Sequence, residues 1–178
     1  MALKEVELLS GAWYGDKPIT INFPSSWDVV VVGKKNIPAL TDNQIREKIN
    51  NPQLSDLASK RNCVAIIIDD ITRPTPTAKL IPFILEELKH AGINEDSIII
   101  VIASGTHKSA SIEDIIKKVG EDIAHRIKVI PHDCRQDLVY LGKSSRGTPI
   151  YVNQTVLECD LKIWVGCIYP HASAGFFR

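Results

Sequence analysis

The chain has 178 residues, of which 44% are hydrophobic and 24% charged, and its 21 basic and 21 acidic residues give a formal net charge of zero. This composition is typical of a globular protein that buries one core, and the balanced charge argues against nucleic acid or an anionic membrane surface as the main partner. No apolar run approaches the roughly 20 residues that span a bilayer, and the charged start of the chain is unlike a signal peptide.

The first 33 residues predict β structure that precedes the main sheet. Val6–Leu9 alternates weakly, Trp13–Pro18 indicates a turn, and Ile19–Phe23 alternates again, which is typical of a hairpin. A further short strand is expected over Val29–Val32, ending at Gly33. None of these residues carries obvious chemistry.

Helices and buried strands alternate along the rest of the chain. The run Cys63–Asp69 predicts a strand buried on both faces, because a continuous apolar run bounded by turn residues is typical of such a strand. Before it, helices are predicted over Thr41–Asn50 and Leu54–Lys60. After it we expect a helix from Pro76 to about His90, a strand over Ser97–Ala103, a helix from Ser111 to about Gly120, a strand over Ile127–Pro131, a hairpin-like insertion over Val139–Val152, a short helix over Val152–Glu158 and a strand over Leu161–Val165.

This alternation predicts the fold class. Strands that alternate with helices imply right-handed crossovers and a mostly parallel sheet. The expected fold is therefore α/β and Rossmann-like, with helices flanking the sheet and a β segment at the N-terminus. The four cysteines, at positions 63, 134, 159 and 167, form no Cys-x-x-Cys pair and lack the spacing of a metal site. We expect them to be reduced thiols in a cytoplasmic protein.

Polar side chains follow three of the predicted strands. In an open parallel sheet, ligands bind at the carboxyl ends of the strands, so these side chains are expected to converge on one site. The residues concerned are Asp69, Asp70, Thr72, Arg73, His107, Lys108 and His171.

The residue types at this edge suit acid/base chemistry on a small carboxylic acid. Two histidines on opposite sides of a ligand can exchange protons with both of its faces, since imidazole titrates near neutrality. Arg73 can hold a carboxylate through a two-pronged hydrogen bond, and an acidic partner can fix a histidine tautomer. Structural roles are open as well: Asp69 and Asp70 can cap the turn that follows them, and His107 is equally compatible with a structural role.

Three motifs resemble the nickel-pincer lactate racemase family in order, spacing and strand context. The resemblance covers nearly the whole chain, from the early β segment to Phe176. The motifs are Asp70-Ile-Thr72-Arg73-Pro74, Ala103-Ser-Gly-Thr-His107-Lys108 and Pro170-His171-Ala-Ser-Ala-Gly175-Phe176.

The resemblance implies a function and a role for each site residue. It implies that His107 and His171 are the catalytic acid/base pair on the substrate hydroxyl, and that Asp70, Thr72 and Arg73 bind the substrate. In that family, hydride passes to and from a pyridinium ring that bears a nickel ion, so a 2-hydroxyacid such as lactate inverts through a keto acid. The partner implied is this small molecule, with neither nucleic acid nor membrane.

The sequence departs from the family near its end. The family continues past Gly-Phe with a lysine that carries the nickel-pincer nucleotide, whereas this sequence stops at Arg178. We expect residues 1–178 to form a single N-terminal catalytic-type domain that is incomplete at its C-terminal end. The resemblance implies the nickel cofactor in the full-length protein and none in this chain, whose only relation to the metal is the proximity of His171. The short chain is expected to be inactive and to form a homo-oligomer through exposed apolar surface.

Two other functions remain open from the sequence. One is a phosphoryl-transfer or hydrolytic enzyme, because Asp69-Asp70-Ile-Thr72 after a strand is similar to the haloacid dehalogenase nucleophile motif, although that motif does not have adjacent aspartates. The other is a non-catalytic ligand-binding domain that shares the fold.

Overall fold

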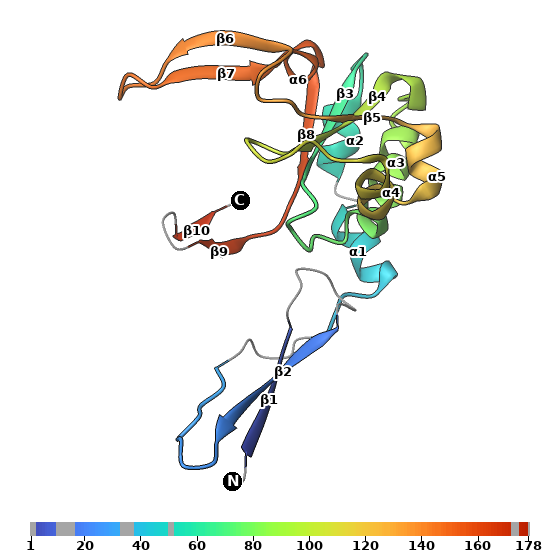
Figure 1. Ribbon diagram of the computed structural model, residues 1–178. Helices are drawn as coiled ribbons and strands as arrows, with labels where there is room; N and C mark the ends of the chain where they lie inside the picture. Colours follow the sequence, from blue (N-terminus) through green and yellow to red (C-terminus); the bar gives the residue numbers. More distant parts are fainter. Residues whose placement is uncertain (1–2, 10–16, 33–37, 50–51, 172–174, 178) are drawn as a thin grey trace.

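A four-stranded parallel sheet lies at the centre of the protein (Figure 1). The computed structural model describes residues 3–9, 17–32, 38–49, 52–171 and 175–177. The sheet has the order β5-β4-β3-β8, and all of its neighbouring strands are parallel, which confirms the predicted Rossmann-like sheet. Its strands are β3 (Val64–Asp69), β4 (Ile98–Ala103), β5 (Lys128–Pro131) and β8 (Leu161–Val165).

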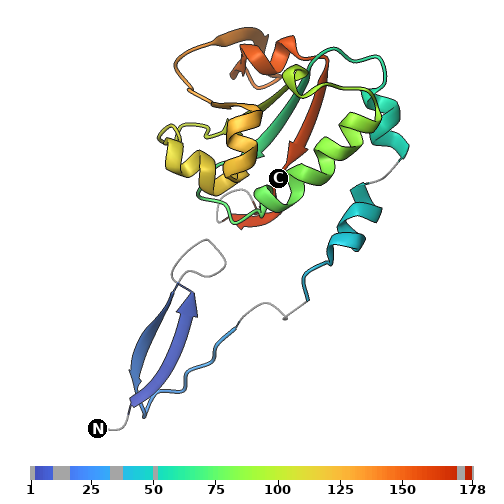
Figure 2. The ribbon, with the colours of Figure 1, turned by 90° about the vertical axis from the view of Figure 1, so that its right-hand side faces the viewer.

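Helices α3, α4 and α5 cover one face of this sheet. In Figure 2, α3 (green) crosses that face, with α4 and α5 (yellow and gold) beside it, and α1 and α2 pack against α3. Alternate side chains of β3 and β4, among them Ile66 and Ile100, join Ile81 and Leu88 of α3 in one apolar cluster. The helices are α1 (Asp42–Ile49), α2 (Pro52–Ala58), α3 (Thr77–His90), α4 (Ile112–Val119), α5 (Glu121–Arg126) and α6 (Gln154–Glu158), with a 3₁₀ turn at Glu95–Ser97.

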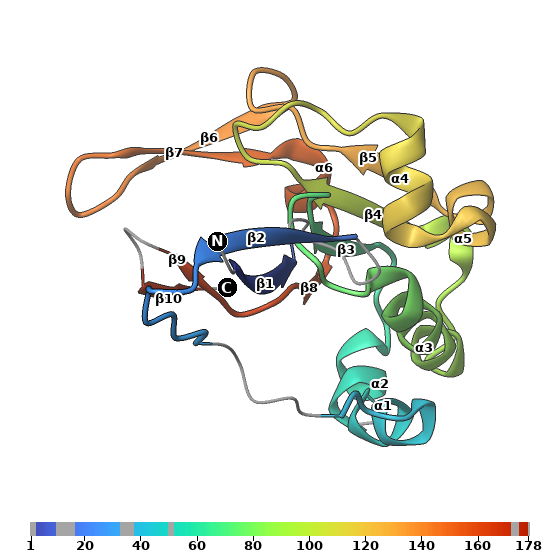
Figure 3. The ribbon, with the colours of Figure 1, turned by 60° about the horizontal axis from the view of Figure 1, so that its bottom comes forward.

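Antiparallel hairpins surround the sheet. The predicted N-terminal hairpin is confirmed as β1 (Leu3–Leu9) paired with β2 (Pro18–Pro24), and it lies apart from the sheet (Figure 1). The predicted insertion is a second hairpin of β6 (Leu138–Lys143) and β7 (Pro149–Asn153), which projects from the side of the sheet opposite α3 (Figure 3). A third pair, β9 (Tyr169–His171) and β10 (Gly175–Phe177), was not expected from the sequence.

Two expectations from the sequence are wrong. Val29–Val32 forms no strand, because no strand in the described part of the chain pairs with it, and Val30 to Val32 are exposed. Gly33 and most of the predicted turn before β2 lie outside the described residues. Cys63 and Cys159 form a disulfide rather than two free thiols, because β3 and β8 start side by side and bring their Cα atoms to 4.7 Å. Cys134 and Cys167 are free. No helix in the described ranges has the length and apolar character needed to cross a bilayer.

Candidate active site

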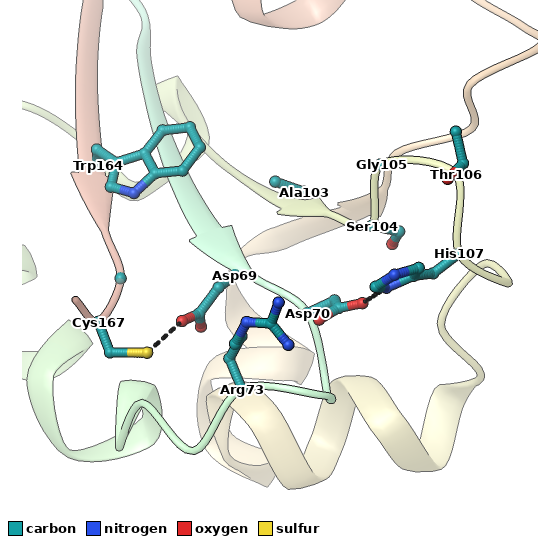
Figure 4. A pocket seen from close by; sticks show the side chains of 11 residues that line it. Asp69, Asp70, Arg73, Ala103, Ser104, Gly105, Thr106, His107, Trp164 and Cys167 are labelled. Carbon is teal, nitrogen blue, oxygen red and sulfur yellow. Dashed lines mark hydrogen bonds and ion pairs between the residues drawn. The ribbon is translucent and has the colours of Figure 1, made fainter. Parts of the chain in front are cut away.

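A pocket of about 350 Å³ opens at the carboxyl ends of β3, β4 and β8 (Figure 4). This is the edge at which parallel α/β sheets bind ligands. Of the side chains predicted to converge here, the structure brings together Asp69, Asp70, Arg73 and His107. The lining consists of Asp69, Asp70, Arg73, residues 103–107, Trp164, Gly166 and Cys167.

Asp70 and His107 form a hydrogen-bonded pair in this pocket. Nδ1 of His107 lies 2.6 Å from Oδ2 of Asp70, and because a carboxylate only accepts hydrogen bonds, Nδ1 carries the proton. The carboxylate is buried, whereas the imidazole is 55% exposed. The other ring nitrogen, Nε2, is therefore the atom of His107 that can exchange a proton with a ligand.

Thr72 holds the second oxygen of Asp70. Its hydroxyl donates to Oδ1 of Asp70 at 2.5 Å, and its backbone N–H donates to the same oxygen at 3.2 Å. Burial raises the pKa of Asp70, but hydrogen bonds from Thr72 and His107, together with the charge of His107, outweigh it and hold this pKa below its ordinary value of 3.8. Asp70 is thus an ionised carboxylate with hydrogen bonds to both of its oxygens, and it orients the ring of His107.

The lowered pKa of Asp70 predicts a pH-dependent contribution to stability. A carboxyl group whose pKa is lower in the folded than in the unfolded state stabilises the fold above its ordinary pKa, and this contribution is lost as the pH falls through the folded value. Below about pH 5, we expect the unfolding free energy of the Asp70→Asn variant to fall less with decreasing pH than that of the wild type. The measurement is urea denaturation at a series of pH values. If the unfolding free energy of the variant fell with decreasing pH as steeply as that of the wild type, Asp70 would not make this contribution.

Arg73 points into the pocket from the loop that follows β3 (Figure 4). Its backbone N–H donates to the carbonyl oxygen of Asp70 at 3.1 Å, and its Nη1 donates to the hydroxyl of Thr72, also at 3.1 Å. Thr72 itself does not line the pocket. The structure therefore places Thr72 as a partner of Asp70 and Arg73 rather than as a residue in the pocket wall, whereas Arg73 is placed to meet an anionic ligand.

The sequence did not indicate three side chains that contact Asp69, namely Lys118, Thr75 and Cys167. Lys118 of α4 is only 1% exposed, and its Nζ lies 2.6 Å from Oδ1 of Asp69. Oδ1 of Asp69 has no hydrogen-bond partner among the described residues, so this contact is an ion pair. Oδ2 of Asp69 accepts hydrogen bonds from the hydroxyl of Thr75 and, at 3.7 Å, from the thiol of Cys167. One signal was available for Lys118: it follows Ile115 by three residues and so shares the core-facing side of its helix.

The remaining predicted residues lie elsewhere or stay untested. His171 is part of β9, and its role opposite His107 stays a prediction. Lys108 lines a smaller neighbouring pocket of about 260 Å³ together with Arg135. Within the described part of the chain, no cluster of three His, Cys, Asp or Glu side chains could hold a metal ion.

A family model and two relatives of known function indicate the same protein family. The family model of the lactate racemase N-terminal domain matches residues 14–177. A lactate racemase of Thermoanaerobacterium thermosaccharolyticum is 28% identical over 150 residues, which cover 81% of this chain and 35% of that protein. A lactate racemase of Lactiplantibacillus plantarum is 30% identical over 138 residues, which cover 74% of this chain and 32% of that protein. The chain therefore spans about a third of the length of these relatives.

Solved structures show the same similarity. The lactate racemase apoprotein from T. thermosaccharolyticum matches with a TM-score of 0.75 and 25% sequence identity, over 98% of this chain and 41% of that chain. A protein from Thermotoga maritima matches with a TM-score of 0.64 and 25% identity, over 77% of this chain and 36% of that chain.

Proposed function

This chain belongs to the family of the lactate racemase N-terminal domain, and we propose that it is the N-terminal part of a racemase or epimerase that inverts a 2-hydroxyacid, with lactate as the first substrate to test. The observation that carries this proposal is the Asp70–His107 pair beside Arg73 in one pocket at the edge of the sheet. A 2-hydroxyacid presents a carboxylate and a neighbouring hydroxyl, which match a guanidinium and an imidazole.

Each described residue has a defined task in this proposal. Arg73 binds the substrate carboxylate through two parallel hydrogen bonds. Nε2 of His107 takes the proton of the hydroxyl and returns it, while Asp70 holds the ring through Nδ1 and stabilises its charged form. Thr72 keeps Asp70 in place through Oδ1. His171 is proposed as the second acid/base group, on the basis of its place in the third motif.

The proposed cofactor of the full-length protein is the nickel-pincer nucleotide. When bound, such a group accepts and returns the hydride that side chains cannot carry. Among the described residues, no cluster of three His, Cys, Asp or Glu side chains could hold the nickel ion.

The short chain by itself is proposed to be inactive. It spans about a third of the length of these relatives, and hydride chemistry requires a cofactor. We propose that residues 1–178 form one domain of a longer enzyme. The cytoplasmic location and the self-association expected from the sequence also remain proposals.

The experiment is a racemisation assay. The full-length protein, loaded with the nickel cofactor, is incubated with L-lactate, and D-lactate is followed with a chiral assay; we expect D-lactate to accumulate until the two enantiomers are equal. The 178-residue chain, as the control, should form none. Hydrolysis of a phosphate ester with magnesium, in the absence of racemisation, would favour a hydrolytic enzyme instead. Racemisation by the short chain alone would contradict the proposed need for the rest of the enzyme.

A further inference from the structure

Lys118 connects the two ends of the segment that carries the site. Its Nζ lies 2.6 Å from Oδ1 of Asp69, at the end of β3, and donates to the carbonyl oxygen of Arg73 at 2.9 Å. Asp70 and Thr72 lie between these two points. A single buried ammonium group thus contacts both ends of residues 69–73.

The sequence of α4 fixes the position of this lysine. Ser111 caps the helix in a capping box, in which its side chain accepts from the backbone N–H of Asp114 while the side chain of Asp114 accepts from the backbone N–H of Ser111. Ile115 and Val119 pack against the core. Lys118 therefore enters the protein from a helix that is anchored at its first turn and along its buried face.

We propose that Lys118 is a positioning residue, whose ammonium group holds residues 69–73 in the conformation that presents Asp70 and Arg73 to the pocket. The identity of the ligand rests on the proposed function, but the positioning itself does not. The competing explanation is that Lys118 only neutralises the carboxylate of Asp69, whose Oδ1 is buried. A buried ion pair does not by itself indicate a functional role, since an apolar pair often stabilises a protein equally well.

The contact with Arg73 distinguishes the two explanations. Charge neutralisation involves only Asp69, whereas positioning also requires the hydrogen bond to the carbonyl oxygen of Arg73. Within this segment, the backbone N–H of Thr72 donates to Oδ1 of Asp70, and that of Arg73 donates to the carbonyl oxygen of Asp70. The hydrogen exchange rates of these two amides report directly on the order of the segment.

The experiment compares two variants of the ligand-free chain by amide hydrogen exchange. Lys118→Met leaves the buried Oδ1 of Asp69 without its cationic partner and should reduce stability. The double variant Asp69→Asn/Lys118→Met removes both charges and should recover most of that stability. In both variants we expect the amides of Thr72 and Arg73 to exchange at least about tenfold faster, relative to the core amide of Ile100, than in the wild type.

The control is Glu87→Gln, a buried polar change on α3 at a side chain that pairs with Ser55 and does not line the pocket. It should leave the relative exchange of Thr72 and Arg73 unchanged. Wild-type exchange of both amides in the double variant would overturn the proposal and leave Lys118 as a counter-ion only. Because no ligand is present, a failure of lactate racemisation would not affect the result.

Discussion

Replacing His107 with alanine in the full-length, cofactor-loaded protein is expected to reduce the turnover number for lactate by about two to four orders of magnitude, the usual range for a general acid/base group. The physical reason is the geometry of the pocket. Nδ1 is occupied by Asp70 at 2.6 Å, so Nε2 alone can move the proton of the substrate hydroxyl. The measurement is the initial rate of D-lactate formation at saturating L-lactate.

A matched control is His125→Ala, which removes an exposed histidine at the end of α5 that binds the carbonyl oxygen of Glu121. This variant should keep the wild-type rate. The same large loss is expected for His171→Ala if the two histidines act as a pair. A His107→Ala enzyme within threefold of the wild-type rate would remove His107 from the chemistry.

Arg73→Ala should lower kcat/KM for lactate by about 10- to 100-fold, because a hydrogen bond to a charged group contributes about 1.5–3 kcal/mol. A carboxylate contact in the ground state lowers KM, so KM should rise; kcat should fall as well, because the same contact positions the substrate hydroxyl at His107. Arg73→Lys should recover only part of the loss, since an ammonium group keeps the charge but not the two-pronged geometry. Steady-state kinetics at a series of lactate concentrations separates these parameters.

The control for the arginine is Arg135→Ala, which removes an exposed guanidinium that lines the neighbouring pocket and not the site. It should leave both parameters unchanged. Equal KM and kcat values for Arg73→Ala and the wild type would place the substrate carboxylate elsewhere.

The central sheet could be predicted from the sequence because its strands are nearly continuous apolar runs. Burial on both faces selects such runs in β3 and β4, and turn residues fix where they end. Short strands such as β9 and β10 were missed, because three residues carry no periodic signal and depend on a pairing partner. The run Val29–Val32 has the right residue types, but none of the strands that the structure describes pairs with it.

Contacts between distant positions required the structure. Cys63 and Cys159 are separated by 96 positions, and only the order of the sheet reveals that β8 lies beside β3. The proximity of Asp70 and His107 could be predicted, because the carboxyl ends of parallel strands lie at one edge of the sheet. The hydrogen bond between them could not be predicted in this way. Lys118 was missed because a lysine is usually solvated, and its burial is intelligible only once Asp69 is seen beside it.

The most direct test of the proposed function is racemisation of L-lactate in D₂O by the full-length, cofactor-loaded protein, followed by mass spectrometry of the hydrogen at C2 of the D-lactate formed. If the histidines exchange only the proton of the hydroxyl and the hydrogen at carbon moves as hydride, the product should keep protium at C2 while racemisation proceeds. Deuterium at C2 would show that a side chain removes the proton from carbon and would contradict the task proposed for His107 and the proposed hydride transfer; the absence of any D-lactate would contradict the proposed activity.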